Sequence, residues 1–156
     1  MNLSYDAWGA GLAARRILLV EDNPDDQLLV LRALKKNHMD SEVTVVDDGV
    51  KALEYLFAEG KYRDRAAETL PMLMLLDIKL PRLDGRDVLR QLRADRRTRH
   101  LPVVVMTSSS EEADIRKSYE LGANSYIRKP VDSDQFTSTV TQLGHYWLNL
   151  NQSPYA

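Results

Sequence analysis

Short apolar runs recur along the chain with polar, helix-like segments between them. The runs are continuous rather than alternating, which is typical of strands that are buried on both faces of a parallel sheet. There are five such runs, the last weaker than the others: Ile17–Val20, Val43–Val46, Met72–Leu76, Val103–Met106 and Ser125–Arg128. We therefore expect a sheet of five parallel strands.

The segments between the runs carry apolar residues at helical spacing. Asn23-Pro24 is typical of a helix start, with the Asn side chain as N-cap and Pro at the first helical position. Asp25 and Asp26 follow in the first turn, where negative charge favours the helix dipole, and the helix continues to Lys36. The other expected helices are Gly49–Phe57, Asp84–Ala94, Glu111–Leu121 and Ser133–Leu148. Five β–α units predict an α/β, doubly wound fold with right-handed crossovers.

This repeat accounts for most of the chain. We expect one domain over residues 16–148, preceded by an N-terminal arm at 1–15 and followed by a short tail at 149–156. A long charged connection, Ala58–Pro71, precedes the third strand, and it has room for a short helix of its own.

Composition narrows the possible functions. The chain is 44% hydrophobic and 28% charged, which is ordinary for a globular domain. It has no cysteine, which excludes disulfides, thiolate zinc sites and thiol catalysis. A net charge of −2 gives no reason to expect nucleic acid or an anionic membrane as partner. No apolar run approaches the roughly 20 residues that span a bilayer, and the N-terminus lacks a secretory pattern. We therefore expect a cytoplasmic protein.

The candidate chemistry lies where four of the expected strands end. Glu21-Asp22 follows the first strand, Asp77 the third, Thr107-Ser108 the fourth and Lys129 the fifth. The carboxyl ends of parallel strands meet at one edge, so these side chains should converge. Clustered carboxylates repel one another unless a cation neutralises them. Oxygen ligands of this kind suit Mg²⁺, and a lysine beside the metal can share the charge of a phosphoryl group. Asp77 is the best candidate nucleophile because it ends the central strand.

Each of these signals also has a simpler explanation when it is taken alone. Glu21 and Asp22 could be acidic residues beside a helix N-terminus, and Asp77 could be a turn residue. Thr107 with the serines that follow could cap a helix, and Lys129 could be a loop lysine. We favour a phosphoryl site because all four fall at the same edge, in a chemistry that needs all of them.

Four stretches resemble the hallmarks of response-regulator receiver domains: VEDNPDD, LMLLDIKLPRLDG, VVVMTSSS and GANSYIRKP. The resemblance runs from Arg16 to roughly Leu143. It implies a flavodoxin-like fold with strand order 2-1-3-4-5 and a phosphoryl group accepted by Asp77. It further implies a Mg²⁺ site made by the carboxylates of Glu21, Asp22 and Asp77 and the backbone carbonyl of Lys79.

The same resemblance implies roles for the neighbouring positions. Thr107 with Ser108, and the Lys129 ammonium, would hold the phosphoryl oxygens, and Tyr126 would be the aromatic switch. Pro130 stands where the family often has a cis peptide bond, and Gly85 would allow the turn after Asp77. Lys79 departs from the family pattern, because many relatives carry Asn or another polar residue there. That position resembles one that affects dephosphorylation, so it bears on the lifetime of the phosphorylated state.

A narrower resemblance covers two further segments. The charged connection 58–71 and the closing LGHYWLNLNQSP resemble the single-domain regulators of bacterial phytochrome histidine kinases. This implies a phytochrome-type kinase as partner. It also implies a homodimer formed through the fourth and fifth helices and the C-terminal extension, with Tyr146 and Trp147 as contact candidates. The alternative is that these aromatics simply cover the sheet.

Three functions remain to be distinguished. The first is a regulator that signals through protein contacts rather than as an enzyme. The second is a binding module whose intact pocket is not used for signalling, or the related phosphate sink that drains the kinase. The third is an aspartate-based phosphohydrolase of the haloacid-dehalogenase type. Those enzymes normally carry a second Asp two residues after the nucleophile, where this chain has Lys79. The missing general acid argues against the hydrolase.

Overall fold

Five parallel strands form the sheet in this computed structural model, which describes residues 16–39, 42–65 and 69–155. The strands are β1 (Arg16–Val20), β2 (Glu42–Val46), β3 (Leu73–Leu76), β4 (Val103–Thr107) and β5 (Ser125–Arg128). Their order across the sheet is β2-β1-β3-β4-β5, and every neighbouring pair is parallel. The fold class predicted from the sequence is confirmed. The expected arm at 1–15 lies outside the described residues.

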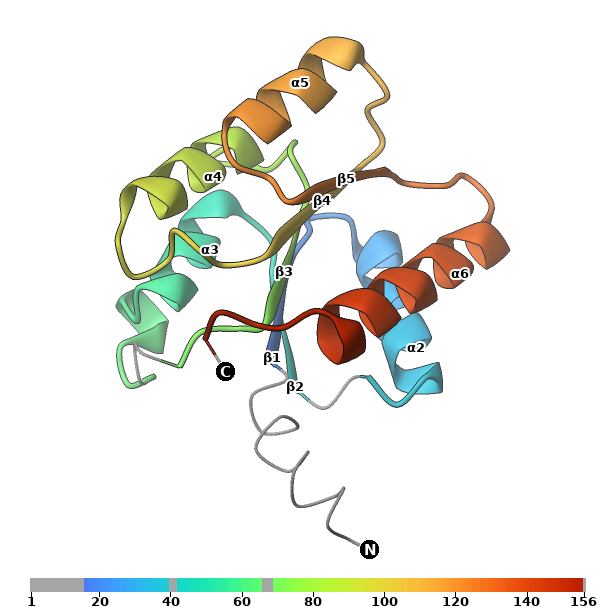
Figure 1. The fold of residues 1–156 in the computed structure, drawn as a ribbon, viewed down its shortest axis with the longest axis horizontal. Coiled ribbons are helices and arrows are strands. Elements are labelled where there is room, and N and C mark those ends of the chain that lie inside the picture. Colours follow the sequence, from blue (N-terminus) through green and yellow to red (C-terminus); the bar gives the residue numbers. More distant parts are fainter. Residues whose placement is uncertain (1–15, 40–41, 66–68, 156) are drawn as a thin grey trace, which may run out of the picture.

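Helices cover both faces of this sheet (Figure 1). The helices are α2 (Pro24–Lys36), α3 (Gly49–Leu56), α4 (Gly85–Ala94), α5 (Glu112–Glu120) and α6 (Ser133–Gly144). α2 and α6 pack together on one face, while α3, α4 and α5 follow one another on the other. Within the described ranges, none of the helices has the length and hydropathy that crossing a bilayer would require.

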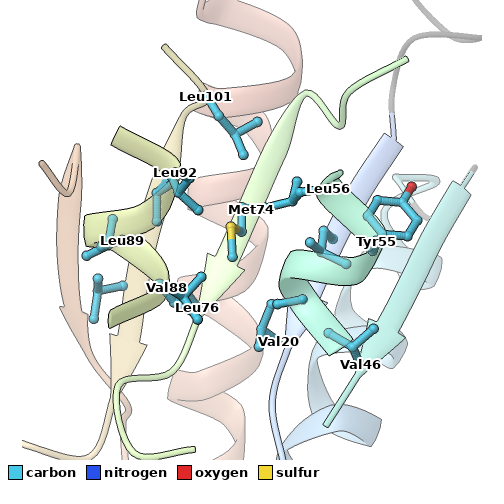
Figure 2. Close-up of a cluster of buried hydrophobic side chains, with 14 of the residues drawn as sticks. Val20, Val46, Tyr55, Leu56, Met74, Leu76, Val88, Leu89, Leu92 and Leu101 are labelled. Carbon is cyan, nitrogen blue, oxygen red and sulfur yellow. The ribbon is translucent and has the colours of Figure 1, made fainter. Parts of the chain in front are cut away.

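The continuous apolar strands fill two cores because successive side chains point to opposite faces. Leu18 and Val20 of β1 pack under α3 and α4, while Ile17 and Leu19 pack under α2 and α6. Figure 2 shows the first core, where side chains from α3 and α4 meet those of the central strands. Burial on both faces fixes the strands, and so fixes where their carboxyl ends lie.

Four of the described helices begin at a side-chain cap, and the first of these caps was predicted from the sequence. The side-chain oxygen of Asn23 accepts hydrogen bonds from the backbone N–H groups of Asp25 and Asp26, at 2.9 and 3.2 Å. Asp48, Asp84 and Asp132 cap α3, α4 and α6 in the same manner. Each cap fixes the point at which the chain leaves the sheet edge and enters a helix.

Two segments differ from a simple strand–helix repeat. The connection before β3 contains a short 3₁₀ helix, η1 (Gly60–Tyr62). The last helix, expected to run to Leu148, ends at Gly144 and continues as a π-helix, η2 (His145–Leu150). The backbone N–H of Asn151 bonds to the carbonyl of Tyr146, five residues earlier, at 2.7 Å. Apolar spacing cannot separate this wider turn from an α-helix, so the boundary was not predictable from the pattern.

Candidate functional site

The candidate site lies at the carboxyl edge of the sheet, and backbone hydrogen bonds carry the sheet geometry into it. Glu21 N–H donates to the Val46 carbonyl at 3.0 Å, and Asp77 N–H donates to the Val20 carbonyl at 3.1 Å. Lys129 N–H donates to the Thr107 carbonyl at 2.7 Å. These bonds lie one residue beyond the strands, so the site backbone is held almost as firmly as the sheet itself.

The ammonium group of Lys129 is the centre of the site. Its Nζ lies 2.6 Å from Oε1 of Glu21, 2.9 Å from Oδ2 of Asp77 and 2.9 Å from Oδ2 of Asp26. An ammonium has three protons to donate, so each carboxylate can take one. Lys129, Glu21 and Asp77 are all buried, whereas Asp26 is partly exposed. The structure thus joins strand ends β1, β3 and β5 to the first turn of α2.

Three carboxylates lie close enough together to bind one metal ion. Oxygen atoms of Glu21, Asp22 and Asp77 all lie within 4.8 Å of one another, with Asp22 exposed and the other two buried. An oxygen-only donor set of this kind fits a hard divalent cation. Lys79 N–H donates to Oδ1 of Asp77 at 3.3 Å. The expected role of the Lys79 carbonyl stays a prediction.

Burial and charge act against each other in this cluster. Burial raises the pKa of Glu21 to about 7, although the hydrogen bond from Lys129 opposes the rise. Burial also disfavours the Lys129 cation, but the hydrogen bonds to Glu21, Asp26 and Asp77 hold the pKa of Lys129 above its usual value. With Asp22 included, four carboxylates face one ammonium. The excess negative charge favours a second cation at this edge.

A cavity of about 280 Å³ opens beside Asp77. It is lined by Asp77, Lys79, Thr107, Ser108, Ser109, Ser110 and Glu111. Thr107 is buried at the end of β4, whereas Ser108 is exposed on the loop that follows. The hydroxyl groups of this lining and the ammonium of Lys79 can donate hydrogen bonds to an anion attached to Asp77.

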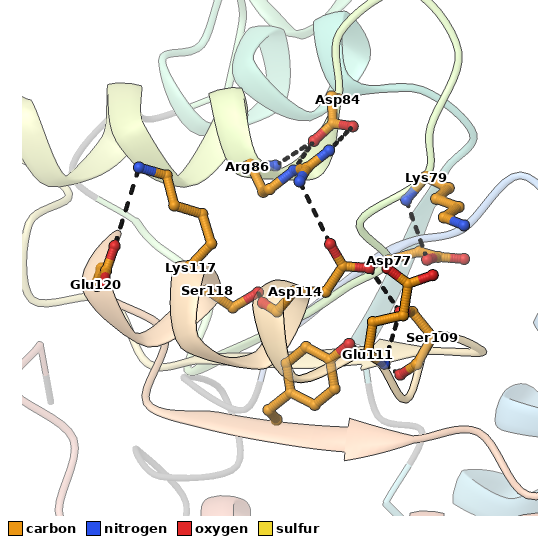
Figure 3. Close-up of polar contacts among 11 residues, drawn as sticks. Asp77, Lys79, Asp84, Arg86, Ser109, Glu111, Asp114, Lys117, Ser118 and Glu120 are labelled. Carbon is orange, nitrogen blue, oxygen red and sulfur yellow. Dashed lines mark hydrogen bonds and ion pairs between the residues drawn. The ribbon is translucent and has the colours of Figure 1, made fainter.

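Tyr126 is tied to the loop between β4 and α5. Its hydroxyl donates to the carbonyl of Ser109 at 2.9 Å, and burial raises the pKa of Tyr126. The Ser109 hydroxyl donates to Asp114 at 2.6 Å, and Asp114 lies 3.4 Å from Nη1 of Arg86 (Figure 3). A chain of contacts thus runs from β5 through this loop to α5 and α4.

The loop between β3 and α4 requires a close approach rather than a flexible turn. A β-carbon at Gly85 would lie 2.3 Å from the carbonyl oxygen of Asp77, and Gly85 N–H donates to the Ile78 carbonyl at 2.7 Å. The left-handed residue of the loop is Arg82, with φ of 63°. Gly85 therefore serves the turn after Asp77 by leaving room for the backbone to pass.

Two other expectations concern residues outside the charged cluster. The peptide bond before Pro130 is trans, so the cis bond implied by the resemblance is wrong for this structure. Trans is the intrinsically favoured isomer of an X–Pro bond, and it already allows Lys129 to reach its three carboxylates. Tyr146 and Trp147 lie in η2, with ring centroids 5.0 Å apart, and are not brought to the site.

Sequence reasoning missed one charged group of the site. Asp26 was interpreted only as a residue that favours the helix dipole, yet its carboxylate contacts Lys129. The available signal was its position three residues after the N-cap Asn23, at the end of the sheet where β1 delivers Glu21. Side-chain direction in a first helical turn is set by the entry angle of the helix, which the sequence does not specify.

Comparison with known proteins supports this geometry. The family profile described as response regulator receiver domain matches residues 17–141. Response regulator Rcp1 of Synechocystis sp. is 36% identical over 140 residues, which cover 90% of this chain and 93% of Rcp1. Its manganese-bound structure superimposes with a TM-score of 0.83. Another similar structure, the receiver domain of sensor histidine kinase PA1611 from Pseudomonas aeruginosa, has a magnesium ion coordinated in its active site cleft.

Two further structures connect the chain to phytochrome regulators. The phosphorylated cyanobacterial phytochrome response regulator RcpA has a TM-score of 0.84 at 38% identity, covering 90% of this chain and 98% of that one. The bacteriophytochrome response regulator RtBRR is 48% identical with a TM-score of 0.72, covering 90% of this chain and 84% of that one. The structural similarity therefore covers most of this chain and most of each of the two regulators.

Proposed function

The chain belongs to the response regulator receiver family, and we propose that it accepts a phosphoryl group on Asp77 from a sensor histidine kinase. A receiver of this kind is not a conventional enzyme, since the group that it receives stays on its own side chain. The signal then leaves through contact with another protein. The contact of Lys129 with Asp77 at 2.9 Å is the observation that carries this proposal.

In the proposed step, a carboxylate oxygen of Asp77 attacks the phosphorus of a phosphohistidine on the kinase. A P–O bond forms while the P–N bond breaks, and the imidazole leaves with the electron pair. Lys129, with the hydroxyl groups of Thr107 and Ser108, holds the phosphoryl oxygens. The carboxylates of Glu21, Asp22 and Asp77, with the Lys79 carbonyl, would hold Mg²⁺, and the ion would supply positive charge against the developing negative charge.

The phosphoryl group would act on the rest of the domain through Thr107 and Tyr126. Phosphorylation adds about −1.5 to −2 units of charge, which draws the Thr107 hydroxyl inward. Tyr126 can then leave the Ser109 carbonyl, to which it now donates at 2.9 Å, and turn toward the core. The surface of α5, β5 and α6 changes with it.

The acceptor can be tested directly with a small phosphodonor. Incubation with phosphoramidate and Mg²⁺, followed by intact mass measurement, should add one phosphoryl group to the parent and none to Asp77→Asn. Asp87→Asn is a matched control, because Asp87 is a carboxylate on α4 that pairs with Arg90 at the surface. Equal labelling of Asp77→Asn and the parent would show that the acceptor lies elsewhere.

We further propose that the cognate kinase is of the phytochrome type. The likeness to RcpA and to RtBRR over most of their length supports this. Phosphotransfer profiling against a panel of histidine kinases, light-regulated ones included, tests it. Transfer that is fastest from a phytochrome kinase is the expected result, and a clear preference for another class contradicts it.

We also propose a homodimer through α5, β5, α6 and the C-terminal extension. A groove beside the edge strand β5 has a mixed lining, in which Ile127, Leu143 and Tyr146 lie beside polar residues such as Gln142. Tyr146 is 49% and Leu150 70% exposed. Trp147 forms part of the same groove, yet it also packs against the α2–α6 core. Tyr146→Ala should therefore weaken the dimer with less effect on folding than Trp147→Ala, as measured by light scattering and thermal unfolding.

The dimer measurement also separates a messenger from a phosphate sink. A messenger should change its assembly, or its affinity for a partner, when beryllofluoride or another phosphoryl mimic is added. A sink needs only to take up and lose the phosphoryl group, so the mass of its assembly and its affinity for partners should stay the same. An unchanged mass and unchanged partner binding would favour the sink.

A further inference from the structure

We propose that Asp26 is a positioning residue, which keeps the Lys129 ammonium in place when a divalent cation occupies Glu21, Asp22 and Asp77. The inference rests on the proposed function, because it concerns the same metal site. It assigns a contact role to a side chain whose only role so far was to favour the helix dipole. Three observations carry it: two concern how the partners of Lys129 are shared, and the third concerns how Asp26 is held in place.

The first observation is that Lys129 and a metal would compete for the same oxygens. Glu21 and Asp77 contact the Lys129 ammonium at 2.6 and 2.9 Å. The same two residues belong to the acidic cluster, which Asp22 completes. When their oxygens turn to a divalent cation, Lys129 loses much of the negative charge that holds it, while it stays buried at 7% side-chain exposure.

The second observation is that Asp26 lies outside this competition. It contacts Lys129 at 2.9 Å, yet it is not one of the three residues whose oxygens gather in the metal cluster. Among the contacts of the Lys129 ammonium in the described structure, Asp26 is therefore the carboxylate that stays available. A buried ammonium without a partner is costly, so this contact lowers the cost of giving the other two to a metal.

The third observation is that Asp26 is itself held in place. The N-cap side chain of Asn23 accepts a hydrogen bond from the Asp26 N–H at 3.2 Å. The helix that follows is anchored on the sheet by Val30, Ala33 and Leu34, which are all buried. Asp26 can thus hold the ammonium near Asp77, ready for a phosphoryl oxygen, without moving when the metal binds.

Asp25 provides a matched control for this role. It is the neighbouring carboxylate in the same first turn, its N–H donates to the same Asn23 oxygen at 2.9 Å, and it is exposed. Asp25→Asn and Asp26→Asn therefore remove the same charge from the same helix end. Only the second removes a charged contact with Lys129.

Titration calorimetry with MgCl₂ tests the proposal. We expect Asp26→Asn to weaken Mg²⁺ binding about tenfold, because the buried ammonium loses a charged hydrogen-bond partner. Asp25→Asn should change affinity by no more than about twofold, because exposed charges are screened. Asp26→Glu should recover most of the loss. Thermal unfolding in EDTA checks that each variant is folded.

A double-mutant cycle with Lys129→Met shows whether Asp26 acts through Lys129. In that background there is no ammonium to hold, so Asp26→Asn should weaken binding no more than Asp25→Asn does. The proposal is overturned if the two Asn variants have equal effects in the parent, or if the tenfold loss persists without Lys129. Asp77→Asn separates this from the proposed function. If it leaves Mg²⁺ affinity unchanged, the metal site itself is wrong. If it weakens affinity while Asp26→Asn does not, only the role of Asp26 fails.

Discussion

Arg82 and Asp48 join the loop after β3 to the start of α3, with Nη2 and Nε of Arg82 at 2.7 and 2.9 Å from Oδ2 of Asp48. The other oxygen of Asp48 accepts the backbone N–H of Lys51 at 2.8 Å and caps the helix. One buried carboxylate therefore fixes both a helix start and the loop that leads away from Asp77. Neither residue lines the cavity beside Asp77.

The first prediction concerns the pH dependence of this contact. Burial alone raises the pKa of Asp48, but the hydrogen bonds from Lys51 and Arg82 outweigh it and hold the pKa below its usual 3.8. A carboxyl with a depressed folded pKa stabilises the fold above its unfolded value, and this contribution is lost as pH falls through the folded value. Asp48→Asn should thus lower the free energy of unfolding by about 1–3 kcal/mol at neutral pH. The difference from the parent should shrink below pH 3.8.

Urea denaturation at several pH values measures both effects. Asn keeps the capping ability of the position, so the loss reports mainly on the pair with Arg82. Asp47→Asn is the control, because Asp47 lies just before α3, is exposed and forms an ion pair with the partly exposed Lys51. A loss that is the same at pH 7 and in acid would rule out a charged contact as its cause.

The second prediction concerns the space under the acceptor. A β-carbon at Gly85 would meet the Asp77 carbonyl oxygen at 2.3 Å, and backbone on both sides cannot move aside cheaply. Gly85→Ala should therefore cost about 1–3 kcal/mol of stability, despite the better helix propensity of Ala. Displacement of Asp77 should also slow labelling by phosphoramidate by at least about tenfold, because small errors in the position of a reacting group are costly.

Gly144→Ala is the control for this experiment. A β-carbon there would meet the sulfur of Met39 at 2.8 Å, which is the flexible end of a side chain far from the carboxyl edge. This variant should lose stability without losing the labelling rate. If Gly85→Ala is labelled as fast as the parent, the close approach does not position the acceptor.

The core of the site could be predicted because it follows from strands. Continuous apolar runs predict buried parallel strands, and the carboxyl ends of such strands lie at one edge of the sheet. The residues that directly follow the runs should therefore lie close to one another at that edge. This reasoning alone predicts that Glu21, Asp77 and Lys129 meet, and the contacts of Lys129 confirm that they do. The strand order came from the family resemblance, and the sheet confirms it.

The same reasoning could not predict the contacts that side chains of helices and loops make. Asp26 and Asp114 belong to helices whose entry angle decides where their carboxylates point, and no spacing rule gives that angle. The cis and trans isomers of an X–Pro bond differ in free energy by only about 0.5–1 kcal/mol. A sequence motif therefore does not determine which isomer precedes Pro130. The left-handed backbone conformation of Arg82 could not be predicted from the sequence either, because non-glycine residues rarely adopt it.

The third prediction concerns the loop that holds Tyr126. Asp114 accepts the Ser109 hydroxyl and pairs with Arg86, so Asp114→Ala removes two contacts that order the loop between β4 and α5. Backbone amides at 109–112 should exchange hydrogen about tenfold faster, the factor that corresponds to a lost contact of about 1.4 kcal/mol. Glu120→Gln is the control, since its ion pair with Lys117 is exposed and 4.0 Å long. Unchanged exchange in Asp114→Ala would mean that Tyr126 orders the loop without it.

The fourth prediction concerns the lifetime of the phosphorylated state. Lys79 is exposed and lines the cavity beside Asp77, so its side chain lies where water can approach a phosphoryl group on that residue. Its ammonium should be attracted to the phosphoryl oxygens and should cover them. Lys79→Ala removes both charge and bulk, and hydrolysis should become about threefold to fivefold faster, as expected for a partly screened charge contact near 1 kcal/mol.

Lys79→Met separates the two contributions, because it keeps the length of the side chain without its charge. If electrostatic attraction holds the side chain in place, Lys79→Met should be hydrolysed as fast as Lys79→Ala. Raised salt should then bring the hydrolysis rate of the parent closer to that of the two variants. Lys51→Ala, at the surface beside Asp47, should leave the decay unchanged. The decay of the phosphorylated protein is followed by intact mass after the donor is removed. A longer lifetime in Lys79→Ala would mean that Lys79 promotes the attack of water instead of blocking it.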